Sequence, residues 1–356
     1  MLFTKSQDYI STKDFIQNTV EQTHRNHQDV QIVMHDLRYE EGLPSNLLDY
    51  SRCLLAEQHQ EKAICLSHHA ESQLLTRLGI PISYMNRCPH HLKTTNINYW
   101  LSEFQNKKVF LRWYKEHNGL EIVRAIFSSR FSPDLDDHIL YPFVLKTLES
   151  TQELNNLFIE EFIQENDFSI LKIIFRNTEV NVNELGTFHA GILISNSEVG
   201  KSSVHIQPIV ENIYQLNEYN FIDRGEGYVS IKHVGDLKQE TVATAIFNVY
   251  KIAQTGISYL LHLRTQEVIN PVEETIELVK KNTMLTNRLV EAVKEVLGES
   301  STNKLTLYKV LIDSIKTLPL FVKHIMEKEI GNHMKLFQNI DNRIDSVINQ
   351  LLSEDE

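Results

Sequence analysis

The stretch VFLRWYKEHNGLEIVRAIFS, residues 109–128, predicts a β-hairpin. Two runs rich in β-branched and aromatic residues flank the dipeptide Asn118-Gly119, and both of its residues tolerate the positive φ angles of a two-residue hairpin turn. Such a turn fixes the pairing of the strands, in which His117 faces Leu120, Trp113 faces Arg124, Arg112 faces Ala125 and Phe110 faces Phe127. We expect this hairpin to belong to the sheet of the central region.

Helices and further strands are predicted on both sides of the hairpin. Ser67 is placed as an N-cap, and Gly79 ends the helix that follows it. Further helices are predicted over residues 89–104 and 136–148, and strands over residues 63–66, 158–164, 169–175, 189–195 and 203–209. The N-terminal segment carries a helix start at residues 11–14 and a short strand at residues 31–34. The predicted fold class is α+β, with a mixed or antiparallel central sheet and helices around it.

From Thr241 onward the pattern becomes helical. Helices are predicted over residues 241–263, 271–297 and 304–352, the last of them broken at Pro319. Near its end a spacing of four and three residues, close to a heptad, joins Ile330, Met334, Phe337, Asp341, Ile344, Ile348 and Leu351. This seam is explained either by packing within the chain or by docking on a partner or a second copy.

The chain is therefore expected to have three parts. Residues 1–62 form a mixed α/β segment, residues 63–240 the central α+β domain, and residues 241–356 an all-helical region for assembly or partner binding. We expect a homo-oligomer held through the C-terminal helices.

The composition indicates a folded protein of the cytoplasm. Hydrophobic residues make up 42% and charged residues 23% of the chain, as in ordinary globular proteins. The net charge of -12 argues against a broad nonspecific DNA binder but allows a local basic face. Three cysteines fit a reducing compartment, and the N-terminus lacks the apolar core of a signal peptide. Residues 241–263 are too polar to cross a membrane, so no membrane contact is expected.

Two clusters raise the question of a metal. Cys65 with His68, and Cys88 with His91, have zinc-knuckle spacing but lack the glycine-rich context of a knuckle. Asp134, Asp136, Asp137 and His138 could hold a divalent cation or perform acid–base chemistry, but aspartates before a helix also cap it. The capping interpretation is favoured, and no metal, cofactor or catalytic residue is predicted.

The hairpin also offers a surface for single-stranded nucleic acid. It interleaves cations with aromatic residues, the combination that phosphate contacts and base stacking require. The cations and aromatics that we single out are Arg112, Trp113, Tyr114, Arg124 and Arg130. The alternative is internal packing, with Trp113 stacked on Arg124 as a cation–π pair.

A polar loop at residues 195–203 is the last candidate. Gly200-Lys201-Ser202 resembles the end of a phosphate-binding loop, but Ser195 stands where the first glycine of that motif belongs. The loop is therefore either a hydrogen-bonded turn or a polar ligand contact. Its candidate residues are Ser195, Asn196, Ser197, Glu198, Gly200 and Lys201.

Three segments carry a family resemblance. They are His69-Ala70 with Gln73-Leu74, LGIP at residues 78–81 and Tyr84; RAIFSSRF at residues 124–131 with Asp136-Asp137; and AGILISNSEVG at residues 190–200, running on to Gln207-Pro208. In this order they resemble an uncharacterised domain of phage, plasmid and integrative-element proteins, described only as phage/plasmid-like. The resemblance spans about residues 63–235. Members of that family continue with an Arg-rich strand and a Cys-Thr-Asn-Gly-like turn, whereas this chain has ENIYQLNE at residues 211–218.

The resemblance implies a protein of a mobile genetic element in a bacterial host cytoplasm. We expect a non-enzymatic phage protein that takes part in a nucleic-acid transaction, such as single-strand binding, recombination or replication. One alternative is a protein that binds and inhibits a host defence or restriction system. A second is a metal-dependent hydrolase.

Overall fold

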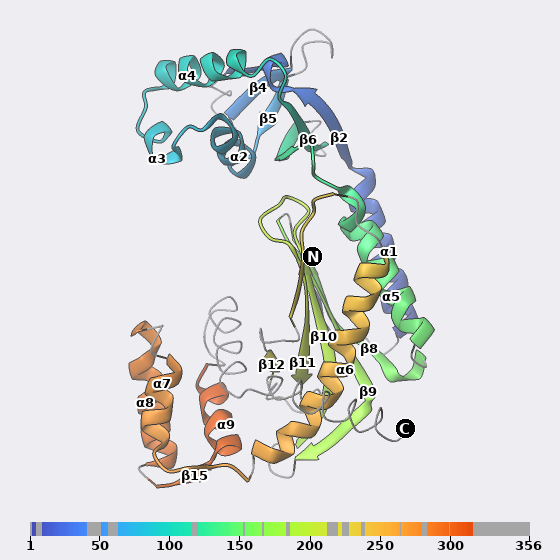
Figure 1. Ribbon diagram of the computed structural model, residues 1–356, viewed down its shortest axis with the longest axis vertical. Helices are drawn as coiled ribbons and strands as arrows, with labels where there is room; N and C mark the ends of the chain where they lie inside the picture. The colour runs from blue at the N-terminus through green and yellow to red at the C-terminus, as the bar shows by residue number, and fades with distance from the viewer. Residues whose placement is uncertain are drawn as a thin grey trace, which may run out of the picture.

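The protein is described by a computed structural model that covers residues 2–4, 9–40, 51–55, 63–115, 120–151, 154–165, 167–182, 186–211, 220–222, 228–235, 239–263, 265–279, 283–298 and 300–315. Within these ranges it is a mixed α/β structure with largely antiparallel sheets, in agreement with the predicted class. Figure 1 shows two sheets arranged one above the other along the longest axis.

The first sheet contains the predicted hairpin. Its described strands run in the order β2 (His27–Val33), β6 (Lys108–Lys115), β7 (Glu121–Ser128), β5 (Ala63–Leu66), β4 (Ser51–Leu55) and β3 (Leu37–Glu40). Three helices pack with it in the upper part of Figure 1, namely α2 (His68–Leu78), α3 (Ile82–Met85) and α4 (His90–Glu103). Leu74, Ile97 and Leu111 are among the buried side chains that join these helices to the sheet.

The pairing of the hairpin was predicted correctly at one end and wrongly at the other. Phe110 pairs with Phe127, and Arg112 with Ala125. A β-bulge between Arg112 and Trp113 then shifts the register, so Trp113 pairs with Val123 and Arg124 lies at the bulge. The expected Trp113–Arg124 pair is therefore absent. The expected pair of His117 and Leu120 lies outside the described residues, because the turn itself is not among them.

The second sheet forms the centre of the molecule. Its strands are β1 (Leu2–Thr4), β8 (Leu157–Gln164), β9 (Ser169–Val182), β10 (Gly186–Asn196), β11 (Val204–Glu211) and β12 (Asn220–Ile222), in that order, and β13 (Val229–Ile231) also pairs with β11. One face packs against α1 (Tyr9–Arg25), α5 (Asp137–Thr151) and α6 (Gln239–Leu263).

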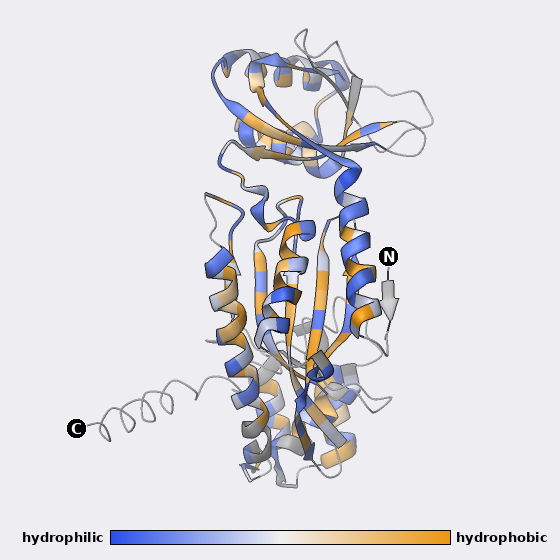
Figure 2. Ribbon diagram, turned by 90° about the vertical axis from the view of Figure 1, so that its right-hand side faces the viewer, coloured by the Kyte–Doolittle hydropathy of each residue, from blue (hydrophilic) through white to orange (hydrophobic). Residues whose placement is uncertain are grey.

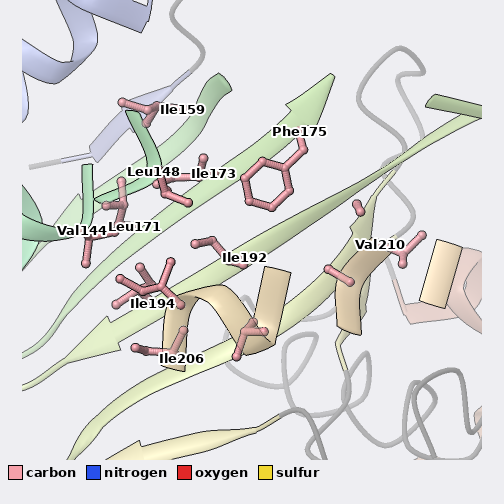
Figure 3. Packing of buried hydrophobic residues seen from close by; sticks show 14 of the residues in the cluster. Val144, Leu148, Ile159, Leu171, Ile173, Phe175, Ile192, Ile194, Ile206 and Val210 are labelled. Atoms are coloured by element: carbon pink, nitrogen blue, oxygen red, sulfur yellow. The ribbon is translucent and has the colours of Figure 1, made fainter. Parts of the chain in front are cut away.

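The alternation of side chains along β10 explains how the helices pack on this sheet. Phe188, Ala190, Ile192 and Ile194 face the helices, and Figure 3 shows Ile192 and Ile194 packed with residues of β9, β11 and α5. Figure 2 shows hydrophobic and hydrophilic positions interspersed along the strands of the second sheet and the helices packed on it. The helices thus cover the apolar face of the sheet.

Most of the predicted elements are present. Ser67 caps α2 by accepting a hydrogen bond from the backbone N–H of Ala70, and α2 ends at Leu78 with Gly79 as its C-cap. Pro81 and Pro89 stand immediately before α3 and α4. The helix start expected at residues 11–14 lies inside α1, which begins at Tyr9.

The described residues of the C-terminal part are mostly helical. The expected helix over residues 271–297 is described as α7 (Pro271–Val279) and α8 (Thr283–Leu297), followed by α9 (Lys304–Ile315). Two short strands, β14 (Glu267–Val268) and β15 (Thr302–Asn303), pair with each other. Pro319 and the heptad-like residues 330–351 lie outside the described residues.

The three expected parts share strands and core packing in the described residues. Strands from residues 1–62 pair within both sheets, so this segment is not a unit of its own. Helix α6 buries Val242, Ile246 and Val249 in the core of the second sheet, so a boundary at residue 240 would cut through this core. Strand pairing and helix packing between distant parts of the chain therefore cross the expected boundaries.

A separate finding concerns membranes. Among the described residues, no helix combines the length and the apolar character needed to cross a bilayer.

Gly191 tests the packing of the second sheet. A Cβ atom at this position would lie 2.5 Å from the backbone oxygen of Ile173, which cannot move away without distorting β9. Gly191→Ala is expected to lower the free energy of unfolding by about 3 kcal/mol. Ser195→Ala on the same face of β10 should cost less than about 1 kcal/mol. Urea unfolding measures both values, and equal losses would contradict this packing.

Candidate functional site

Arg112 lies buried where the two sheets meet. Its Nε and Nη2 donate to the two carboxylate oxygens of Asp29, at 2.9 and 2.6 Å. Its Nη1 and Nη2 donate to Asp136, at 2.8 and 2.5 Å, and Nη1 also donates to the backbone oxygen of Glu198, at 2.9 Å. The five N–H groups of a guanidinium are thereby all used. We call Arg112, Asp29, Asp136 and Glu198 the Arg112 network.

The network joins the two sheets. Asp29 and Arg112 are paired neighbours on β2 and β6 of the first sheet. Asp136 immediately precedes α5, and Glu198 follows β10 of the second sheet. Burial alone would lower the pKa of Arg112, but its hydrogen bonds with Asp29 and the charge of Asp136 raise it. The guanidinium therefore stays charged and holds the sheets together.

The loop after β10 is held from several sides. Asn196 Nδ2 donates to the backbone oxygen of Leu135 and to Asp137, both at 2.8 Å. Glu198 Oε1 accepts from the backbone N–H of Asp137 at 2.9 Å and so caps α5. Gln73 of α2 donates to the backbone oxygen of Val199 at 2.9 Å. The loop is therefore fixed to both sheets rather than free in solvent.

Asp137 is, like Asp136, a deeply buried acid of this junction. It is 3% exposed and accepts from Ser169 and Asn196, both at 2.8 Å. Burial, and next the charge of Glu198, raises its pKa to about 8. Its surroundings therefore favour the protonated form of Asp137 near neutral pH.

A pocket opens beside the Arg112 network, with a volume of about 380 Å³. Its walls combine cations, hydroxyl groups and aromatic rings. We call it the junction pocket, and it is lined by Arg77, Phe127, Ser128, Phe131, Gly200, Lys201, Ser202, Ser203, Lys232, His233 and Val234. None of these described lining residues is acidic.

The aromatic wall of the pocket is built on the Arg112 network. Phe127 and Phe131 stack at 3.8 Å, and Phe131 stacks on His233 at 5.5 Å. The guanidinium of Arg112 lies 5.2 Å from the centre of the Phe131 ring, within the range of a cation–π contact. Gly200 has a φ of 75°, and a Cβ atom there would lie 2.8 Å from the ring of Phe127. A glycine is therefore required where the loop meets this wall.

The three cations of the pocket differ in their contacts and in their exposure. Arg77 donates its Nε to the backbone oxygen of Ile126 at 2.9 Å, which leaves the outer guanidinium nitrogens without a hydrogen bond among the described residues. Lys201 pairs with Asp167, and both side chains are close to half exposed. Lys232 is exposed. The pocket therefore presents positive charge to solvent in an acidic protein.

The structure places the hairpin candidates mostly inside the protein. Arg112 is 2% exposed, and Trp113 is 6% exposed and donates to Gln28. Arg124 lies close to His27 and Glu198 because the bulge turns it toward the side of Arg112. Tyr114 is half-buried, and only Arg130 of this set is exposed. The hairpin is therefore not the open nucleic-acid surface that the sequence suggested.

The loop candidates divide into two groups. Asn196, Ser197 and Glu198 are buried in the junction, and Ser195 pairs with His205 within the sheet. Gly200 and Lys201 line the pocket. Sequence reasoning missed Arg77, Lys232 and His233, which carry no motif and reach the pocket only through the fold.

The structure brings ligands together for one of the two metal hypotheses and not for the other. Cys65 is 3% exposed within β5, and among the described residues no cluster of ligands includes either cysteine. Asp136, His138 and Glu198 do come together, with one ligand atom of each within 4.8 Å of the others. Asp134 instead accepts a hydrogen bond from Ser132. The sequence thus identified two of the three residues of this cluster.

Comparison with known proteins adds no further identification. Neither the family models, nor the curated proteins, nor the solved structures gave a match to this chain. The resemblance of residues 63–235 to phage/plasmid-like proteins therefore stays a prediction.

Arg112→Ala tests the network. The substitution leaves Asp136 buried without its cation, so we expect a loss of about 3 to 5 kcal/mol in the free energy of unfolding. Arg130→Ala removes an exposed arginine a few residues beyond the hairpin and should cost less than about 0.5 kcal/mol. Chemical denaturation followed by circular dichroism measures both losses. A small loss for Arg112→Ala would show that the network does not hold the sheets.

His233 gives a prediction for acid stability. Burial, and next the charge of Arg112, lowers its pKa from the ordinary 6.5 to about 4. Between these values the unfolded chain binds a proton that the folded chain does not, so stability falls as the pH falls. This one group contributes about 1.4 kcal/mol per pH unit in that window.

Substitution isolates this contribution. Between pH 6.5 and pH 4.5, the unfolding free energy of His233→Phe should fall by about 1.4 kcal/mol less per pH unit than that of the wild type. His90→Phe, at an exposed position on α4, should keep the wild-type slope. Urea titrations at three pH values give the slopes, and an unchanged slope in His233→Phe would refute the assignment.

Proposed function

We propose that this chain binds single-stranded nucleic acid and that the junction pocket makes the phosphate contacts. The observation that carries the proposal is the set of Arg77, Lys201 and Lys232 around one pocket that has no acidic lining residue. Backbone phosphates are recognised by such cations, with hydroxyl donors between them. Ser128, Ser202 and Ser203 supply the hydroxyl groups.

The arrangement favours backbone contacts over sequence reading. The faces of Phe131 are covered by Phe127 and His233, so a base would meet ring edges here rather than an open stacking platform. Phosphate contacts carry no sequence information of their own. The proposed binding is therefore tolerant of sequence and sensitive to salt.

The biological setting follows from the sequence resemblance. We infer a non-enzymatic role in a mobile genetic element, as an accessory to single-strand handling, recombination or replication. Assembly through the C-terminal helices would place several junction pockets along one strand, and avidity would then compensate for weak single contacts.

A second candidate function rests on α4. Tyr84, Leu92, Tyr99 and Trp100 are large hydrophobic residues with exposed fractions of 42% or more on α3 and α4. Exposed aromatic residues of this kind are enriched at protein interfaces. They favour the alternative in which the chain binds a host defence protein.

Fluorescence anisotropy of a labelled single-stranded oligonucleotide tests the nucleic-acid proposal. Affinity should fall as salt rises, because each phosphate contact releases counterions. The double substitution Lys201→Glu and Lys232→Glu should weaken binding at least tenfold. It should also reduce the slope of log affinity against log salt by about 1.4, the value for two contacts.

The matched control keeps the same change in net charge. Lys146→Glu with Lys251→Glu alters two exposed lysines on α5 and α6, away from the pocket. This control should bind much as the wild type does. Equal weakening in both double variants would mean that overall charge, not the junction pocket, governs binding. No binding at low salt would refute the proposal.

A further inference from the structure

The acids of the junction outnumber its cations. Among the described residues, Arg112 pairs with the carboxylates of Asp29 and Asp136, and Arg124 lies 3.9 Å from that of Glu198. A divalent cation beside these acids would add positive charge to a buried acidic cluster.

Three of the surrounding side chains offer ligand atoms to one point. One atom each of Asp136, His138 and Glu198 lies within 4.8 Å of the other two. These residues come from the start of α5 and from the loop after β10, which are held in place by the capping of α5 by Glu198. A small closure of these distances would bring all three atoms to bonding distance of a metal ion.

A second observation concerns His138 itself. Its Nδ1 is buried and has no hydrogen-bond partner among the described residues. A buried imidazole nitrogen without a partner is costly, and coordination of a metal removes this cost. The side chain as a whole is half-buried and stacks on the exposed His24, so the cluster lies close to solvent.

The remaining hydrogen bonds of Asp136 and Glu198 hold these two side chains in position. Arg112 donates one hydrogen bond to each carboxylate oxygen of Asp136, and each oxygen retains a further lone pair. The backbone N–H of Asp137 orients Glu198. Hydrogen bonds of this kind orient the ligands at metal sites.

We propose that Asp136, His138 and Glu198 form a binding site for a divalent transition-metal ion. Two carboxylates and one imidazole suit Mn²⁺, Fe²⁺ or Zn²⁺ better than the all-oxygen preference of Ca²⁺. Three protein ligands leave positions open for water or for an oxygen of a bound molecule. The site is independent of the nucleic-acid proposal, because none of its residues lines the junction pocket.

Mn²⁺ is the probe for the test, because thiolates bind it poorly and the cysteines of this chain then do not compete. The full-length protein is stripped with a chelator and dialysed against Mn²⁺, and bound metal is counted. We expect one Mn²⁺ per chain. His138→Gln should weaken binding at least tenfold. Asp134→Asn, an acid in the same stretch that lies outside the cluster, should leave binding unchanged.

A spectroscopic readout does not depend on how well a variant folds. Electron spin echo spectra of the wild-type protein with Mn²⁺ should show ¹⁴N coupling from one imidazole. Absence of bound Mn²⁺ at millimolar concentration would overturn the proposal. Bound Mn²⁺ without ¹⁴N coupling, or with unchanged affinity in folded His138→Gln, would overturn it as well.

Discussion

The buried guanidinium of Arg112 is the interaction on which the rest of the structure depends. Its five donors meet two carboxylates and one backbone oxygen that come from both sheets. Each donor of a buried guanidinium needs a hydrogen-bond acceptor, because a buried donor without one costs the free energy of its desolvation. The positions of Asp136 and Glu198 are therefore fixed, and so are the start of α5 and the loop that leads to Gly200.

This constraint brings together three stretches that are far apart in the sequence. His69 and Gln73 of α2 contact the backbone oxygen of Val199, and Arg124 lies near Glu198. Asp137 contacts both Asn196 and Glu198. These residues belong to the three segments on which the predicted family resemblance rests. Their convergence at one junction gives a physical reason why such segments would occur together.

Local features of the fold were predictable because their causes are local. The Ser67 cap, the end of α2 and the first pairs of the hairpin follow from a few neighbouring residues. The bulge at Arg112 was not predictable, because no local residue pattern marks it and it brings Arg124 near Glu198, a residue far away in the sequence. For the same reason the sequence could not reveal that Arg112 is buried, or that Arg77 and Lys232 meet Lys201 in one pocket.

We propose that single-stranded nucleic acid binds at the junction between the two sheets. Photo-crosslinking of a single-stranded oligonucleotide carrying 5-iodouracil, followed by peptide mapping, tests this most directly. We predict crosslinks within residues 127–132, 199–203 and 231–235, which surround the junction pocket. Crosslinks confined to α4 or to the C-terminal helices would contradict the account.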